Sequence, residues 1–171
     1  MGFFQARGDA NQLLIDVARY IALRTFFSLG IIEGIRLAMK SELVVCRQDS
    51  ITQFANVSEG YRSVYGLCIK HGRRYTIAIC LDRDLSIHSY LDMLELARRV
   101  SHEITHLYAF ENYAEDARSI HYYIDSAVNE GREVEMIAYR DMQVKINGKV
   151  INLKVYDVKE TCKRALSTNY G

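Results

Sequence analysis

The chain has 171 residues, enough for one hydrophobic core but few for two, so we expect a single domain over residues 1–171. Hydrophobic residues make up 49% and charged residues 25%, which excludes a disordered or fibrous chain. A formal net charge of +1 excludes a generally basic protein, so neither nucleic acid nor an acidic membrane surface is expected as a partner.

The most apolar segment lies near the N-terminus, over residues 13–39. Charged residues interrupt it at Asp16, Arg19, Arg24, Glu33 and Arg36. No stretch therefore approaches the roughly 18 uncharged residues of a membrane-spanning helix, and no signal-peptide pattern precedes it. We expect a soluble, cytoplasmic protein. The apolar spacing predicts a helix from about Ala10 to Met39, capped by Asp9 and broken at Gly30 or Gly34.

Short segments rich in β-branched and aromatic residues follow. They are SELVVCR (41–47), TQFANV (52–57), SVYGLCIK (63–70) and YTIAICLD (75–82). The KHGRR segment between the last two is typical of a hairpin turn, so we expect a small, mostly antiparallel sheet. Three of the four cysteines lie in these segments and none forms a Cys-x-x-Cys pair, which argues for buried thiols and against a structural zinc ribbon.

A second helix is predicted from Ser89, where Ser89-x-x-Asp92 resembles a capping box, through residue 110. On it, Glu95, Arg98 and Arg99 are expected to face solvent. A third helical region spans about residues 114–141, with an interruption near 129–131. Two alternating strands then follow in residues 142–158, joined by Asn147-Gly148, a strong hairpin signal. The order of helix, sheet, two helices and a hairpin predicts an α+β fold.

His102, Glu103 and His106 form the pattern His-Glu-x-x-His within the second helix. Residues i and i+4 share one face of a helix, so both imidazoles can reach a single ion. Catalytic zinc sites bind neutral imidazoles and keep one position open for water. Glu103 would lie beside that water and accept its proton as a general base. The pattern predicts one Zn²⁺ with His102 and His106 as ligands and Glu103 as the catalytic residue.

The pentad HEITH is that of the neprilysin-like metallopeptidases and differs by one residue from the HELTH of thermolysin-like enzymes. The chain thus resembles the gluzincins, a resemblance that covers only this helix and implies a Glu ligand from the next helix. In size the chain looks closer to the ImmA/IrrE-like family, in which the first Glu of a Glu-x-Glu-Ala-Asn segment binds zinc. This resemblance implies Glu133 as the third ligand and a compact, minimal zincin fold. Met136 and Ile137 depart from the family's Ala and Asn.

The residues themselves leave the third ligand open. The candidates on the following helical region are His121, Asp125, Glu130, Glu133 and Glu135. A thermolysin-like Asn-Glu pair would favour Glu130. A donor to the oxyanion of the reaction intermediate is also needed. Its candidates are Tyr113, Tyr122, Tyr123, Tyr139 and His121. An extended substrate could pair with residues 75–81 or with residues 66–70.

We therefore expect a small zinc metalloendopeptidase that hydrolyses peptide bonds in a protein or peptide substrate. The alternative is a zincin-fold protein that binds metal or a peptide partner as a regulator without proteolysis. A third hypothesis is a helical domain in which the two histidines are incidental.

Overall fold

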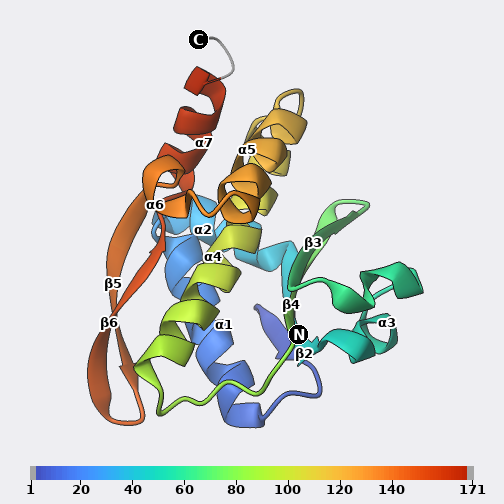
Figure 1. Ribbon diagram of the computed structural model, residues 1–171, viewed down its shortest axis with the longest axis vertical. Helices are drawn as coiled ribbons and strands as arrows, with labels where there is room; N and C mark the ends of the chain where they lie inside the picture. The colour runs from blue at the N-terminus through green and yellow to red at the C-terminus, as the bar shows by residue number, and fades with distance from the viewer. Residues whose placement is uncertain (1–2, 169–171) are drawn as a thin grey trace.

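In the computed structural model, which describes residues 3–168, helix α4 (Tyr90–Asn112) lies between a four-stranded sheet and a two-stranded hairpin (Figure 1). The other helices are α1 (Gln12–Phe27), α2 (Ile31–Met39), α3 (Ile51–Phe54), α5 (Ala117–Asn129), α6 (Glu133–Met136) and α7 (Val158–Thr168), with 3₁₀ turns η1 (Gln48–Ser50) and η2 (Glu59–Ser63). The strands are β1 (Gln5–Arg7), β2 (Ser41–Arg47), β3 (Gly66–His71), β4 (Arg74–Leu81), β5 (Tyr139–Ile146) and β6 (Lys149–Tyr156). The α+β prediction is confirmed.

The four-stranded sheet has the order β1-β2-β4-β3. Strands β3 and β4 form the predicted antiparallel hairpin, but β1–β2 and β2–β4 are parallel pairs. The sheet is thus mixed and not mostly antiparallel, because α1 and α2 return the chain between β1 and β2, as a parallel pair requires. Strand β4 is interior, whereas β3 leaves one edge free of a strand partner among the described residues.

The segment 52–57, predicted as a strand, instead contributes to α3 and the loop after it. Its apolar residues Phe54 and Val57 pack against a second buried cluster, which includes Cys46 and Cys80 and lies on the opposite face of the sheet from the main core. The short helix α3 and the loop after it therefore cover that face of the sheet. β1 and α7 were not predicted at all, the first being only a three-residue strand.

Several boundaries of helices and strands coincide with local sequence signals such as glycines and capping residues. The N-terminal helix breaks at Gly30 (φ 111°), as predicted, but the side chain of Asn11 caps α1, while Asp9 accepts a hydrogen bond from the backbone N–H of Arg47. Ser89 caps α4 through the N–H of Asp92. The predicted hairpin is confirmed, with its turn at Asn147-Gly148.

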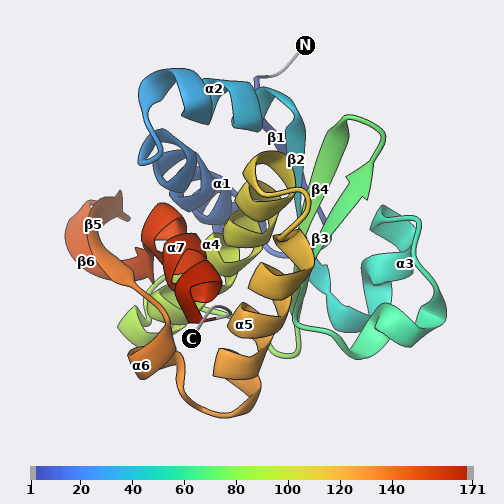
Figure 2. The same ribbon diagram turned by 90° about the horizontal axis from the view of Figure 1, so that it is seen from above.

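The predicted third helical region divides into three parts. Helix α5 ends at Asn129, a turn at Gly131 (φ 67°) follows, and α6 precedes β5, which begins at Tyr139. Both α5 and α7 pack against α4 and against each other (Figure 2). Helix α5 thus covers the side of α4 on which the histidines lie.

The main core extends from Phe4 to Ala165 and joins α1, α4, the four-stranded sheet and the hairpin. One expectation about α4 is wrong: Arg99 is only 7% exposed. Its guanidinium donates to Asp82, Glu95 and the carbonyl of Cys80, so carboxylates compensate its burial. All four cysteines are free. Within residues 3–168, no helix has the length and apolar character needed to cross a membrane.

Candidate metal centre

Helix α4 presents His102 and His106 on the face that contacts α5. Their Nε2 atoms lie 3.1 Å apart, and the side chains are only 14% and 7% exposed. The buried residues Val100, Ile104 and Leu107 fix the rotation of α4 by packing into the core. The predicted spacing therefore brings two imidazole nitrogens to one point, as expected for residues i and i+4.

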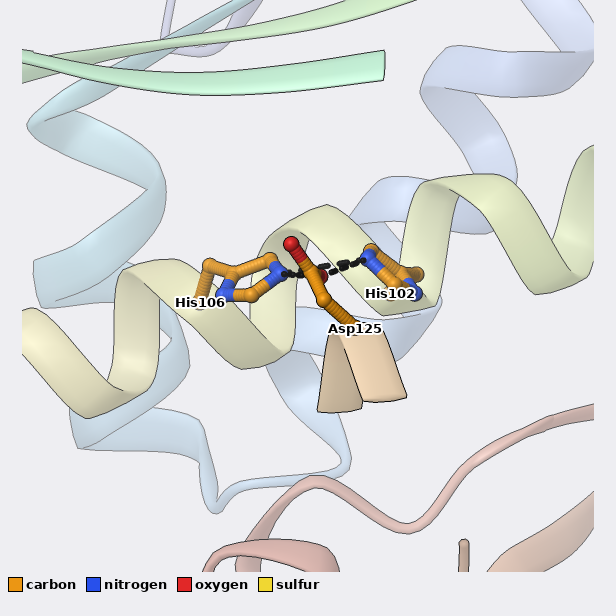
Figure 3. A group of neighbouring side chains, drawn as sticks. All are labelled: His102, His106 and Asp125. Atoms are coloured by element: carbon orange, nitrogen blue, oxygen red, sulfur yellow. Dashed lines mark hydrogen bonds and ion pairs between the residues drawn. The ribbon is translucent and has the colours of Figure 1, made fainter. Parts of the chain in front are cut away.

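Asp125 reaches this point from α5 (Figure 3). Its Oδ1 atom lies 3.5 Å from His102 Nε2 and 3.3 Å from His106 Nε2. A tetrahedral ion with ligands at about 2.0–2.1 Å has ligand–ligand distances of about 3.3–3.4 Å. The three atoms form a triangle close to that size. His102, His106 and Asp125 could therefore hold a metal ion.

The structure brings Asp125, and not Glu133, to the two histidines. Glu133 accepts hydrogen bonds from the hydroxyls of Tyr139 and Tyr156, at 3.1 and 3.0 Å, and pairs with Arg98. The residue that the family resemblance implied as third ligand thus lies on the next helix, α6, outside the group of converging atoms. Of the other candidates, Glu130 and Glu135 form ion pairs with Arg132.

His121 lies next to the triangle without belonging to it. Its Nε2 atom is 3.2 Å from Asp125 Oδ2, on the carboxylate oxygen that does not face His102 and His106. The spacing His121-x-x-x-Asp125 could have revealed this pair in the sequence. Ile120, Ile124 and Ala127 lie on the buried face of α5. His121 directly follows Ile120, and Asp125 directly follows Ile124.

The electrostatics of the centre favour a cation. Burial raises the pKa of the Asp125 carboxyl, but the adjacent imidazoles of His102 and His106 outweigh it and hold that pKa well below its usual range. Burial likewise lowers the pKa of His102, yet the charges of Glu103 and Asp125 raise it above its ordinary value overall. The carboxylates of Asp125 and Glu103 thus favour positive charge at the point where the two ring nitrogens meet.

Glu103 stands beside the triangle. Its Oε2 atom lies 3.8 Å from His102 Nε2, and the residue is 7% exposed. The carboxylate packs against Gly66 of β3, where a Cβ atom would lie only 2.6 Å from Oε2. Glycine at this position lets the carboxylate approach the strand. Glu103 is thus held close to the centre without supplying one of its three converging atoms.

A cleft of about 640 Å³ opens beside the centre. Its walls include Tyr65 and Gly66 at the start of β3, Arg98 and Glu103 of α4, and Asp125 of α5. The cleft therefore adjoins the edge strand. Of the two strands considered for pairing with a substrate, β4 is interior and β3 has the free edge.

The candidate oxyanion donors differ in their hydrogen-bond partners. Tyr139 donates to Glu133 and Tyr123 to the carbonyl of Met136, while the Tyr122 hydroxyl accepts from Arg118. His121 contacts Asp125, which is one of the three residues of the centre. Gly66 and Tyr156 were not anticipated from the sequence, since their roles depend on contacts between distant segments.

Comparison of the chain with protein-family models, with curated proteins and with solved structures gives no match.

Proposed function

We propose that this protein is a zinc-dependent metallopeptidase in which His102, His106 and Asp125 bind the metal and Glu103 is the general base. The observation that carries the proposal is the triangle of two Nε2 atoms and one Oδ1 atom, with distances of 3.1, 3.3 and 3.5 Å. Three protein ligands and an adjacent carboxylate are the components of a hydrolytic zinc site.

The ligand types favour zinc over the alkaline-earth ions. Calcium and magnesium prefer sites made of many oxygen atoms, whereas two imidazoles and one carboxylate suit zinc. Bound zinc would supply a water molecule whose pKa is lowered to about 7. The near-tetrahedral distances support the same choice of metal.

Glu103 would accept the proton of that water and pass it to the departing amine. Its position against Gly66 keeps the carboxylate beside the ligands, 3.8 Å from His102 Nε2. An extended peptide would add to the free edge of β3, so that its backbone runs along the cleft. The resemblance to gluzincins supports the roles of His102, Glu103 and His106, whereas an Asp as third ligand departs from it.

The substitution Glu103→Gln tests the proposal. We expect the variant to bind zinc as the wild type does, measured by elemental analysis, and to lose hydrolysis of a peptide library followed by mass spectrometry. Glu115→Gln is the matched control, because it makes the same change at an exposed residue in the link between α4 and α5.

Unchanged hydrolysis in Glu103→Gln would overturn the role of Glu103. A wild-type protein that takes up no zinc would overturn the metal centre itself. Wild-type protein that binds zinc but cleaves no peptide would contradict the peptidase and favour a non-proteolytic regulator.

A further inference from the structure

The ring nitrogen of His102 that points away from the triangle has its own partner. Its Nδ1 atom lies 3.1 Å from the hydroxyl oxygen of Tyr156, at the end of β6. Tyr156 is fully buried, so solvent does not compete for this contact. The opposite nitrogen, Nε2, faces Asp125 and His106. His102 thus connects the candidate metal centre to the C-terminal hairpin.

The direction of the hydrogen bonds follows from counting protons. The Tyr156 hydroxyl carries one proton and donates it to Glu133 Oε2 at 3.0 Å. A carboxylate can only accept. The contact between Tyr156 and His102 must then use a proton on His102 Nδ1. With its proton on Nδ1, a neutral imidazole has its lone pair on Nε2, the atom that faces the triangle.

The partners of His102 are themselves held in place. The backbone N–H of Tyr156 donates to the hydroxyl of Ser101, which in turn donates to the carbonyl of Ala97. Ser101 directly precedes His102 on α4, so Tyr156 is attached to that helix at two adjacent points. Glu133 is fixed by the hydroxyl of Tyr139 and by the guanidinium of Arg98.

We propose that Tyr156 and Glu133 are positioning residues of the metal centre, which fix the tautomer and the ring orientation of His102 so that Nε2 is available to the metal. The proposal rests on the proposed metal function. It gives Glu133 a role one step removed from the metal, in place of the ligand role expected from the sequence. Partners of this kind typically contribute 10–100-fold to metal affinity.

We call the hydrogen-bonded series Glu133–Tyr156–His102 the relay. Tyr156→Phe tests the relay with the smallest change. The variant keeps the buried ring and the backbone N–H that bonds Ser101, and it removes only the hydroxyl. We expect the zinc dissociation constant, measured by competition with a fluorescent chelator, to rise about 10–100-fold. Tyr90→Phe is the control, because it also removes a hydroxyl that connects α4 to β6, through the Asn152 carbonyl, but touches no part of the relay.

Glu133→Ala tests the direction of the relay. Without the carboxylate, the Tyr156 hydroxyl is free to donate to His102 Nδ1, and the proton of the imidazole moves to Nε2. In metal-free protein, ¹⁵N-edited NMR of the imidazole should report this change of tautomer. Zinc affinity should fall about 10–100-fold. Asp125→Ala, which removes a ligand, should instead abolish stoichiometric zinc.

The outcomes separate this inference from the metal function. Wild-type protein without zinc would overturn both. Zinc affinity equal to wild type in Tyr156→Phe, with an unchanged His102 tautomer in Glu133→Ala, would overturn only the relay. Loss of all zinc in Glu133→Ala, with zinc retained in Asp125→Ala, would also overturn it and restore Glu133 as the ligand.

Discussion

Gly66 controls how closely Glu103 can approach the edge strand. A Cβ atom at this position would lie 2.6 Å from Glu103 Oε2 and 3.3 Å from the carbonyl oxygen of Ala78. The first distance is too short for any side chain, so the carboxylate must move when a methyl group is added. A catalytic group misplaced by about 1 Å can cost on the order of 10²-fold in rate.

We therefore expect Gly66→Ala to lower the rate of peptide hydrolysis about 10²-fold while zinc content is unchanged. Peptide turnover and elemental analysis on the same samples measure the two quantities. Gly60→Ala is the control, because the nearest atom to its added Cβ is Ser58 Oγ at 3.8 Å. Equal rates in the two variants would show that the position of Glu103 does not depend on Gly66.

At the scale of single residues, the sequence paired the two histidines of the triangle, which lie on one helix, but did not single out Asp125, which lies on another. His102 and His106 could be paired because their spacing of four residues implies a shared helical face. Asp125 stood among several acidic candidates, and spacing alone did not distinguish it from Glu133. The choice depends on how α5 packs against α4, which is a tertiary contact.

Among the elements, α4 carries His102, Glu103 and His106. An ion pair stabilises its N-terminus. Asp92 pairs with Arg83 and accepts a hydrogen bond from the backbone N–H of Ser86. The Arg83 guanidinium, together with that N–H, lowers the pKa of Asp92 below its ordinary value. A carboxylate in the first turn also interacts favourably with the helix dipole.

The stability that Asp92 contributes should depend on pH. Because its pKa is lower in the folded than in the unfolded state, the contribution is complete above the unfolded pKa of about 3.9. It disappears as pH falls through the folded pKa. Asp92→Asn should therefore reduce the free energy of unfolding by about 0.5–1 kcal/mol at pH 7, and the difference from wild type should shrink below about pH 4. Urea unfolding at several pH values measures it; a difference independent of pH would contradict the assignment.

Elements bounded by a local signal were predicted well. Ser89 marks the start of α4, Gly30 the break between α1 and α2, and Asn147-Gly148 the final hairpin. The strand prediction for residues 52–57 is wrong because an apolar segment this short fits both the helical and the strand period. Its structure depends on packing against the second buried cluster, which no local pattern indicates. The parallel pairing of β2 with β4 joins segments distant in sequence, so no local pattern indicates it.

For the whole molecule, a bound ion would connect α4 to α5 through His102, His106 and Asp125. A ligand that binds only the folded state stabilises it by mass action, by about 2.7 kcal/mol at a free concentration of about 100 times the dissociation constant. For a chain of this size that corresponds to a rise in Tm of roughly 5–10 °C.

We expect zinc to raise the Tm of the wild-type protein by this amount in differential scanning fluorimetry, and a chelator to reverse the effect. Asp125→Ala should remove the response. An equal rise in Asp125→Ala would mean that zinc stabilises the protein from another location.

The free edge of β3 has a consequence for how the protein behaves at high concentration. Within residues 3–168 no strand pairs with the outer backbone groups of β3, so these groups can bond an extended chain, including β3 of a second copy. Lys70 on this strand, Arg73 in the following turn and Arg74 at the start of β4 are all exposed. Their mutual repulsion opposes the approach of two like edges, and salt weakens that repulsion. Colloidal stability should therefore decline as ionic strength rises, and an occupied cleft should protect against aggregation.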